Sequence, residues 1–152
     1  MIVAITSSQL LWASRQFKRY YEGHFSALLE REGLTMRELY VLLFLVNNPD
    51  RDTARDVVEL RGLPKSQVSG AVDLLAERGL LERLPDRTDR RVVHLALTAP
   101  GTELGQQARA IQTACIQALS APLTQTEKEQ FFALLEKVLT GAESQLRKGA
   151  QA

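Results

Sequence analysis

Residues 61–98 read RGLPKSQVSGAVDLLAERGLLERLPDRTDRRVVHLALT. Gly62 and Pro64 lie two positions apart and mark a tight turn, because glycine ends helices and proline suits the first turn of the next one. The following segment carries apolar side chains at helical spacing and reaches Gly79, a second stop signal. The first half of this stretch therefore predicts a short turn followed by an amphipathic helix.

The second half of the stretch changes period. Two short β-prone runs, 80–84 and 92–97, are separated by the polar residues 85–91. This pattern is typical of a β-hairpin. A helix, a glycine-containing turn, a second helix and a hairpin together predict a winged helix-turn-helix, whose second helix can enter a DNA major groove about 12 Å wide.

Upstream of this stretch the sequence predicts three helices. Apolar residues recur at helical spacing from Ser8 to Arg31, which predicts one long amphipathic helix. Thr35 and Glu38 form a capping box that opens the next helix, in which the apolar run 39–46 is too short to cross a bilayer and indicates a buried helix. The third helix is expected from Asp52 or Thr53 to Leu60, where a glycine follows.

Downstream of the hairpin the sequence predicts two more helices. One begins at Thr98 and runs through Leu119, ahead of a proline that closes it. Thr124 and Glu127 form a second capping box, and the last helix continues through Leu146. The tail from Arg147 is expected to be frayed.

These elements predict a mainly α fold with a small β-hairpin wing. We expect a single domain over residues 1–152, with a winged helix-turn-helix lobe at 35–98. The helices at 8–32 and 99–147 carry more apolar surface than this lobe can cover, so we expect them to be dimerisation helices. The predicted partner is a second copy of the chain, and two-fold symmetry would place the second helix of each helix-turn-helix in successive major grooves of a pseudo-palindromic duplex.

Composition excludes several classes of protein. The chain has 152 residues, 45% of them hydrophobic and 24% charged, so it should bury a core. Its net charge of +1 means that any nucleic-acid surface must come from local clustering. No signal-peptide pattern opens the sequence and a single cysteine cannot form an intrachain disulfide, so we expect a cytoplasmic protein without a membrane partner.

The motifs within 61–98 resemble the MarR family of bacterial transcriptional regulators along their whole length. The matching runs are GL-x-KS-x-VS at 62–69, D-x-L-x-x-RGL-x-ER at 73–83, and the wing sequence D-x-R at 89–91 leading to LT. The resemblance extends over roughly residues 10–146. It implies a sequence-specific DNA-binding regulator, more often a repressor, which is released by a small lipophilic or anionic ligand of phenolic type.

The chemistry of the predicted second helix and wing suits a duplex. Small or polar side chains at the start of the helix can approach phosphates and base edges, and Gln67 can read adenine through two hydrogen bonds. The resemblance implies that Arg91 enters the minor groove or anchors the wing, with Asp89 orienting the neighbouring arginine. The predicted DNA-binding residues are Thr53, Lys65, Ser66, Gln67, Ser69, Gly70, Arg87, Asp89, Arg90 and Arg91.

Four positions depart from the family pattern. Family members usually carry a small residue at Val58, an apolar one at Arg61, a capping serine at Pro64 and an arginine at Gly70. The loss of the arginine removes a base or phosphate contact worth about 1 to 3 kcal/mol if it is bidentate. The alternative function is therefore a winged-helix protein-interaction module with weak or no specific DNA binding.

Other candidate sites have simpler structural interpretations. Trp12, Arg15, Arg19 and His24 are candidates for binding an anionic aromatic effector, although aromatic residues at helical spacing also suit core or dimer packing. Cys115 is either a redox sensor or a buried structural thiol, and its apolar helix position favours the latter. We expect no metal, no cofactor and no enzymatic activity, because no nucleophile motif or phosphate-binding loop is present.

Overall fold

The computed structural model describes residues 6–149, and within them the fold is mainly helical with one two-stranded hairpin. The chain forms two compact units, one up to Cys115 and one from Ile116 onward. The elements are α1 (Ser7–Gly23), α2 (Ser26–Glu32), α3 (Met36–Asn47), α4 (Ala54–Arg61), α5 (Lys65–Glu77), β1 (Leu81–Pro85), β2 (Val93–Leu97), α6 (Ala99–Ser120) and α7 (Gln125–Gly149).

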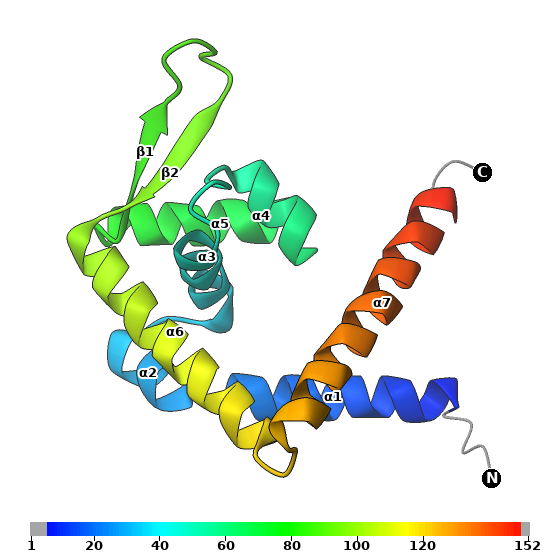
Figure 1. Ribbon diagram of the computed structural model, residues 1–152. Coiled ribbons are helices and arrows are strands. Elements are labelled where there is room, and N and C mark those ends of the chain that lie inside the picture. The colour runs from blue at the N-terminus through cyan, green and yellow to red at the C-terminus, as the bar shows by residue number, and fades with distance from the viewer. Residues whose placement is uncertain (1–5, 150–152) are drawn as a thin grey trace, which may run out of the picture. The chain divides into compact units, whose positions relative to one another are not determined.

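The core of the first unit is built around α3, the helix that the apolar run 39–46 predicted. Its side chains from Leu39 to Leu45 are almost all buried, and α5 and α4 pack against it. Figure 1 shows the hairpin projecting beyond α3, α4 and α5. The buried set includes Phe25 and Leu28 from the N-terminal helices, Val57 from α4, and Val68, Ala71, Val72 and Leu75 from α5.

The predicted capping boxes and glycine stops are confirmed. The backbone N–H of Thr35 donates to Glu38 Oε2 at 2.7 Å. This bond gives a partner to an N–H group at the start of α3 and to the buried carboxylate of Glu38. Thr124 and Glu127 make the same arrangement at the start of α7. Gly62 ends α4 in the left-handed conformation, with φ of 64°, which a residue with a β-carbon rarely adopts.

The single helix predicted over 8–31 is wrong: the chain forms two helices, α1 and α2, with a break at His24 and Phe25. Gly23 has low helix propensity, and His24 Nδ1 and the Ser26 hydroxyl both contact carbonyl groups of the preceding turn. The backbone N–H groups of His24 and Phe25 donate to the carbonyl groups three residues earlier, as in a 3₁₀ turn, instead of four residues earlier. The break lets Phe25 enter the core, where its side chain is fully buried.

Three predicted boundaries also need correction. Pro64 precedes α5 in an extended conformation and occupies the cap position, since its carbonyl oxygen accepts from Gln67 and Val68. The strands begin one residue later than predicted, and Pro85 pairs with Val93 at the outer end of the hairpin. Helix α7 continues to Gly149 with two cations in its last turn, where they interact favourably with the helix dipole, and fraying from Arg147 stays a prediction.

The helices of residues 6–149 include none that is long and apolar enough to span a bilayer. The same residues contain no group of three histidine, cysteine, aspartate or glutamate side chains placed to hold a metal ion.

Candidate nucleic-acid interface

Helix α5 has one buried face and one exposed face. Val68, Val72 and Leu75 enter the core, whereas Lys65, Ser66, Ser69 and Gly70 are exposed and Gln67 is half-buried. The exposed side chains at the start of the helix are short or flexible, so a surface as close as a DNA groove can approach the backbone N–H groups.

Gly70 lies in open space on this exposed face. A β-carbon added there would meet no atom within 4 Å outside its own helix. Packing therefore does not require glycine at this position, and the side chain that the family usually places here would project freely from α5.

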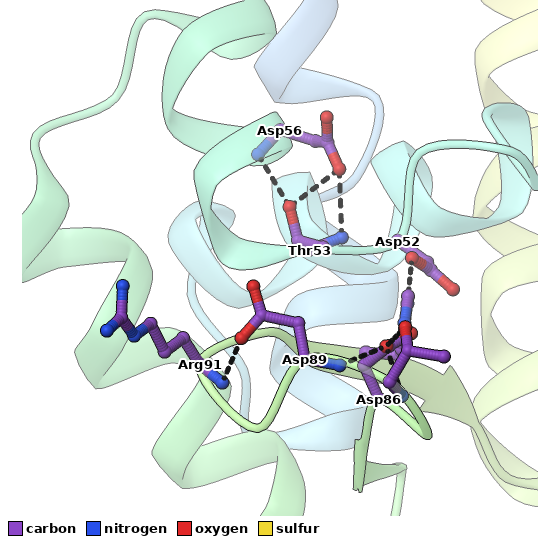
Figure 2. A network of polar contacts seen from close by, with 8 residues as sticks. Asp52, Thr53, Asp56, Asp86, Asp89 and Arg91 are labelled. Atoms are coloured by element: carbon purple, nitrogen blue, oxygen red, sulfur yellow. Dashed lines mark hydrogen bonds and ion pairs between the residues drawn. The ribbon is translucent and has the colours of Figure 1, made fainter.

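Thr53 lies at the N-terminus of α4, where its polar groups are already engaged. Its backbone N–H and its hydroxyl both donate to Asp56 Oδ2, at 3.1 and 2.6 Å, as Figure 2 shows. These bonds hold the pKa of Asp56 below its usual range. The DNA contact predicted for Thr53 therefore lacks a free donor on that residue.

The turn of the wing is organised by one carboxylate. Asp86 Oδ2 accepts from the backbone N–H groups of Thr88 and Asp89, both at 2.9 Å, and from the Thr88 hydroxyl at 2.7 Å. Such side-chain bonds to the following backbone are typical of tight turns. Asp89 in turn accepts from the backbone N–H of Arg91 at 3.0 Å, so it holds the main chain of this arginine rather than its guanidinium.

The three predicted wing arginines, Arg87, Arg90 and Arg91, are all exposed. Figure 2 shows the side chain of Arg91 extending away from Asp89. No ion pair among the described residues involves any of these three guanidinium groups, so their charges remain available to an anion. Arg83 of β1 behaves differently, because it pairs with Asp73 of α5 and ties the wing to that helix.

His94 of β2 is a site residue that the sequence patterns did not identify. Its Nδ1 lies 2.7 Å from Asp52 Oδ1, and its Nε2 lies 2.9 Å from Asp86 Oδ1. The pKa of His94 is raised, mainly by its hydrogen bond to Asp52 and next by its hydrogen bond to Asp86. The pKa of Asp86 is lowered, mainly by its hydrogen bond to His94. The sequence holds a signal for the Asp86 turn, an aspartate two residues before a threonine, but none for the 42-residue separation between His94 and Asp52.

The candidate effector residues lie along α1. Trp12, Arg15 and Arg19 are exposed on one face of this helix, and Trp12 has 64% of its surface accessible. His24 is at the end of the helix, where its Nδ1 lies 2.7 Å from the carbonyl oxygen of Tyr20. Cys115 of α6 is fully buried and burial raises the pKa of its thiol.

Sequence comparison finds relatives among bacterial regulators. Residues 32–92 match the sequence model of the MarR family. The transcriptional repressor MprA of Escherichia coli strain K12 is 33% identical over 79 residues, which cover 52% of this chain and 45% of MprA. The match thus spans less than half the length of this curated relative.

Comparison of folds gives longer matches. The S. aureus MepR structure in complex with DNA superposes with a TM-score of 0.72 and 26% identity, over 91% of this chain and 99% of MepR. Bordetella bronchiseptica BpsR, whose DNA binding is regulated by 6-hydroxynicotinic acid, gives a TM-score of 0.67 and 25% identity over 86% of this chain and 98% of BpsR.

Proposed function

The chain belongs to the MarR family of winged helix-turn-helix regulators, and from this premise we propose that it is a sequence-specific DNA-binding transcriptional repressor. The observation that carries the proposal is that the exposed polar face of α5 and three exposed arginines without ion pairs among the described residues, on the wing that Arg83 ties to α5, belong to one lobe. In this proposal α5 reads base edges in the major groove and the wing contacts the backbone or the minor groove.

Each proposed contact has a distinct role. Gln67 is assigned to base reading, while Lys65, Ser66 and Ser69 hold the phosphates beside the helix. Arg91 enters the minor groove, and Arg87 and Arg90 add charge that is not specific for sequence. MepR, whose structure was solved in complex with DNA, and MprA, a named transcriptional repressor, support DNA binding and repression by a chain of this kind.

We also propose that the protein acts as a homodimer. The apolar faces of α1 and α7 are each exposed in the single chain, with Leu10 at 62%, Leu134 at 60% and Val138 at 66% accessible. Such faces in a regulator are usually covered by a second copy. Sedimentation should therefore show a dimer that Val138→Glu shifts toward monomer, whereas Thr140→Glu, on the opposite polar face of α7, leaves it intact.

The proposed effector is a small aromatic carboxylate or phenol, for which the α1 residues Trp12, Arg15, Arg19 and His24 are the candidates. BpsR supports this chemistry, since 6-hydroxynicotinic acid regulates its DNA binding. Trp12 is the single tryptophan of the chain, so its fluorescence can follow a titration with that acid as the probe. Binding that releases DNA must be weakened equally by DNA, because the coupling is reciprocal.

The experiment that tests the repressor function is selection of bound sequences from a random duplex pool. Enrichment of an inverted repeat at roughly physiological salt would support the proposal, and the repeat would then be used in all affinity measurements. Binding without enrichment that vanishes as salt rises would contradict it. That result would favour the alternative, a winged-helix module that binds another protein.

A further inference from the structure

The ring of His94 joins the segment that precedes α4 to the turn of the wing, which carries the arginines proposed to bind DNA. One partner, Asp52, directly precedes Thr53, the N-cap of α4; the other, Asp86, starts the turn of the wing. Figure 2 shows Asp52 approaching the wing from the start of α4, with Asp86 and Asp89 in the wing turn. The side chain is half-exposed, so water can exchange protons with the ring.

The backbone attaches only the inner part of the wing to this segment. The N–H of Leu95 donates to the carbonyl oxygen of Asp52 at 2.6 Å, and Thr53 pairs with His94 in an isolated β-bridge. These contacts do not depend on the protonation of the ring. Within the hairpin, the turn is held by backbone bonds from the N–H of Asp86 to Val92 O and from the N–H of Val92 to Asp89 O, both at 3.0 Å. The contact that links the turn to Asp52 is the His94 ring, through the bond from Nε2 to Asp86, and Asp86 also organises Thr88 and Asp89.

The chemistry of imidazole makes this link depend on a proton. Both ring nitrogens donate hydrogen bonds only in the protonated form, whereas neutral imidazole has one donor and one acceptor. Ionised carboxylates only accept. A neutral His94 can therefore satisfy Asp52 or Asp86, and the remaining carboxylate faces a nitrogen lone pair.

We propose that protonated His94 is a positioning residue, which holds the wing turn against the start of α4, so that DNA binding weakens when the ring loses its proton. This inference rests on the proposed function, because it concerns how the wing is presented to a duplex. In this inference, the contribution of the wing arginines to DNA affinity depends on the position of the turn as well as on their charge.

The charged groups around the ring favour its protonation. Asp52 and Asp86 are the two that contact it directly, and Leu84, its partner on β1, is uncharged. Most of the other charged side chains described on the packed elements are engaged elsewhere. At α4, Arg51 pairs with Asp56 and Arg55 pairs with Glu59. Arg83 of β1 pairs with Asp73 of α5, and Glu38 of α3 is bonded to Thr35. Arg37 and Glu82 are exposed.

The direction of the pH dependence follows from these contacts. The pKa of His94 is raised above the ordinary value of 6.5, so the link is complete below that value and is lost as the pH rises through the raised pKa. The pKa of Asp86 is lowered, so its carboxylate stays ionised until the pH falls well below 3.8. As the pH rises, the link therefore fails at His94, at a pH above 6.5.

The test compares DNA affinity between about pH 6 and about pH 9, a range that begins below the ordinary pKa of histidine and extends well above it. Affinity of the parent for its selected duplex should fall about fivefold across the titration, the lower end of usual coupling strengths. His94→Gln should bind about as weakly as the alkaline parent at every pH. Asp52→Asn should move the inflection to lower pH, because it removes the carboxylate whose hydrogen bond does most to raise the pKa of His94.

The matched control is Thr88→Ala, which removes a hydrogen bond to the same Asp86 without removing a titrating group. This variant should keep the inflection of the parent. A His94→Gln variant that retained the pH profile of the parent would overturn the inference. So would a parent with a flat profile and a His94→Gln variant weakened by one factor at every pH, because that would be a purely structural effect.

A measurement without DNA separates this inference from the proposed function. In NMR titrations of the free protein, the amide signals of Thr88, Asp89 and Arg91 should follow the titration of the His94 ring in the parent and lose that dependence in His94→Gln. If no duplex is enriched but these signals move together, the proposed function fails and the link stands. If the amide signals ignore the His94 titration, the link is contradicted whatever the outcome with DNA.

Discussion

Gly101 of α6 packs directly against the carbonyl group of Leu80, the residue that enters β1. A β-carbon built on Gly101 would lie 1.7 Å from the oxygen of Leu80, which is impossible without moving backbone. Thr98 closes the same corner, since its hydroxyl donates to Gly79 O at 2.6 Å and its backbone N–H donates to Leu80 O at 3.2 Å. The start of α6 is thereby fixed to the base of the wing.

Gly101→Ala should destabilise the protein by about 1 to 3 kcal/mol, because the added methyl group collides with main chain that cannot rotate away. We expect its Tm to fall by about 3 to 10 °C. Gly141→Ala is the control, since a β-carbon there meets nothing within 4 Å and alanine favours helix. A Gly101→Ala protein as stable as the parent would contradict the close approach.

Gly70→Arg should strengthen DNA binding by about fivefold, or about 1 kcal/mol, because it adds a cation to the exposed face of α5 where space is open. Gly70→Ala tests the backbone alone and should stabilise the helix by about 0.5 to 1 kcal/mol without this gain in affinity. Titration of the selected duplex measures the affinity of both variants, and thermal unfolding measures the stability of Gly70→Ala. Unchanged affinity in Gly70→Arg would mean that this face of α5 does not meet DNA.

Arg91→Ala and Gln67→Ala should fail in different ways. Loss of the exposed Arg91 guanidinium should weaken binding to all duplexes and reduce the salt slope by about one unit for each protomer bound. Loss of Gln67 should relax the base preference at one position and leave the salt slope unchanged. The two measurements are a salt series and a repeated duplex selection, and identical behaviour of both variants would refute the assigned roles.

Cys115 should be chemically inert in the folded protein. Its side chain is fully buried and burial raises the pKa of its thiol, so the reactive thiolate is scarce at neutral pH. Alkylation by iodoacetamide should be slow in native protein and fast after unfolding in denaturant, as followed by mass spectrometry. Rapid native alkylation, or loss of DNA binding on brief peroxide treatment, would instead indicate a redox role.

Local sequence signals predicted most element boundaries. The Thr35 and Thr124 capping boxes and the stop at Gly62 are recognisable because donor, acceptor and turn lie within a few residues. The break between α1 and α2 was missed because the apolar spacing continues across it, while burial of Phe25 and competing bonds from His24 and Ser26 interrupt the helix. Gly23 was the signal available beforehand.

The order of elements, the exposed start of α5 and the family resemblance were therefore determined by the sequence alone, since helical period, caps and turn residues act over short distances. The engagement of Thr53 by Asp56 belongs to the same local class, because the two residues form a capping box three positions apart. The link from Asp52 through His94 to Asp86 and the contact of Gly101 with Leu80 were decided by the tertiary structure. The contacts of His94 with Asp52 and of Gly101 with Leu80 join segments that are far apart along the chain. The periodicity of the sequence cannot show that such segments meet.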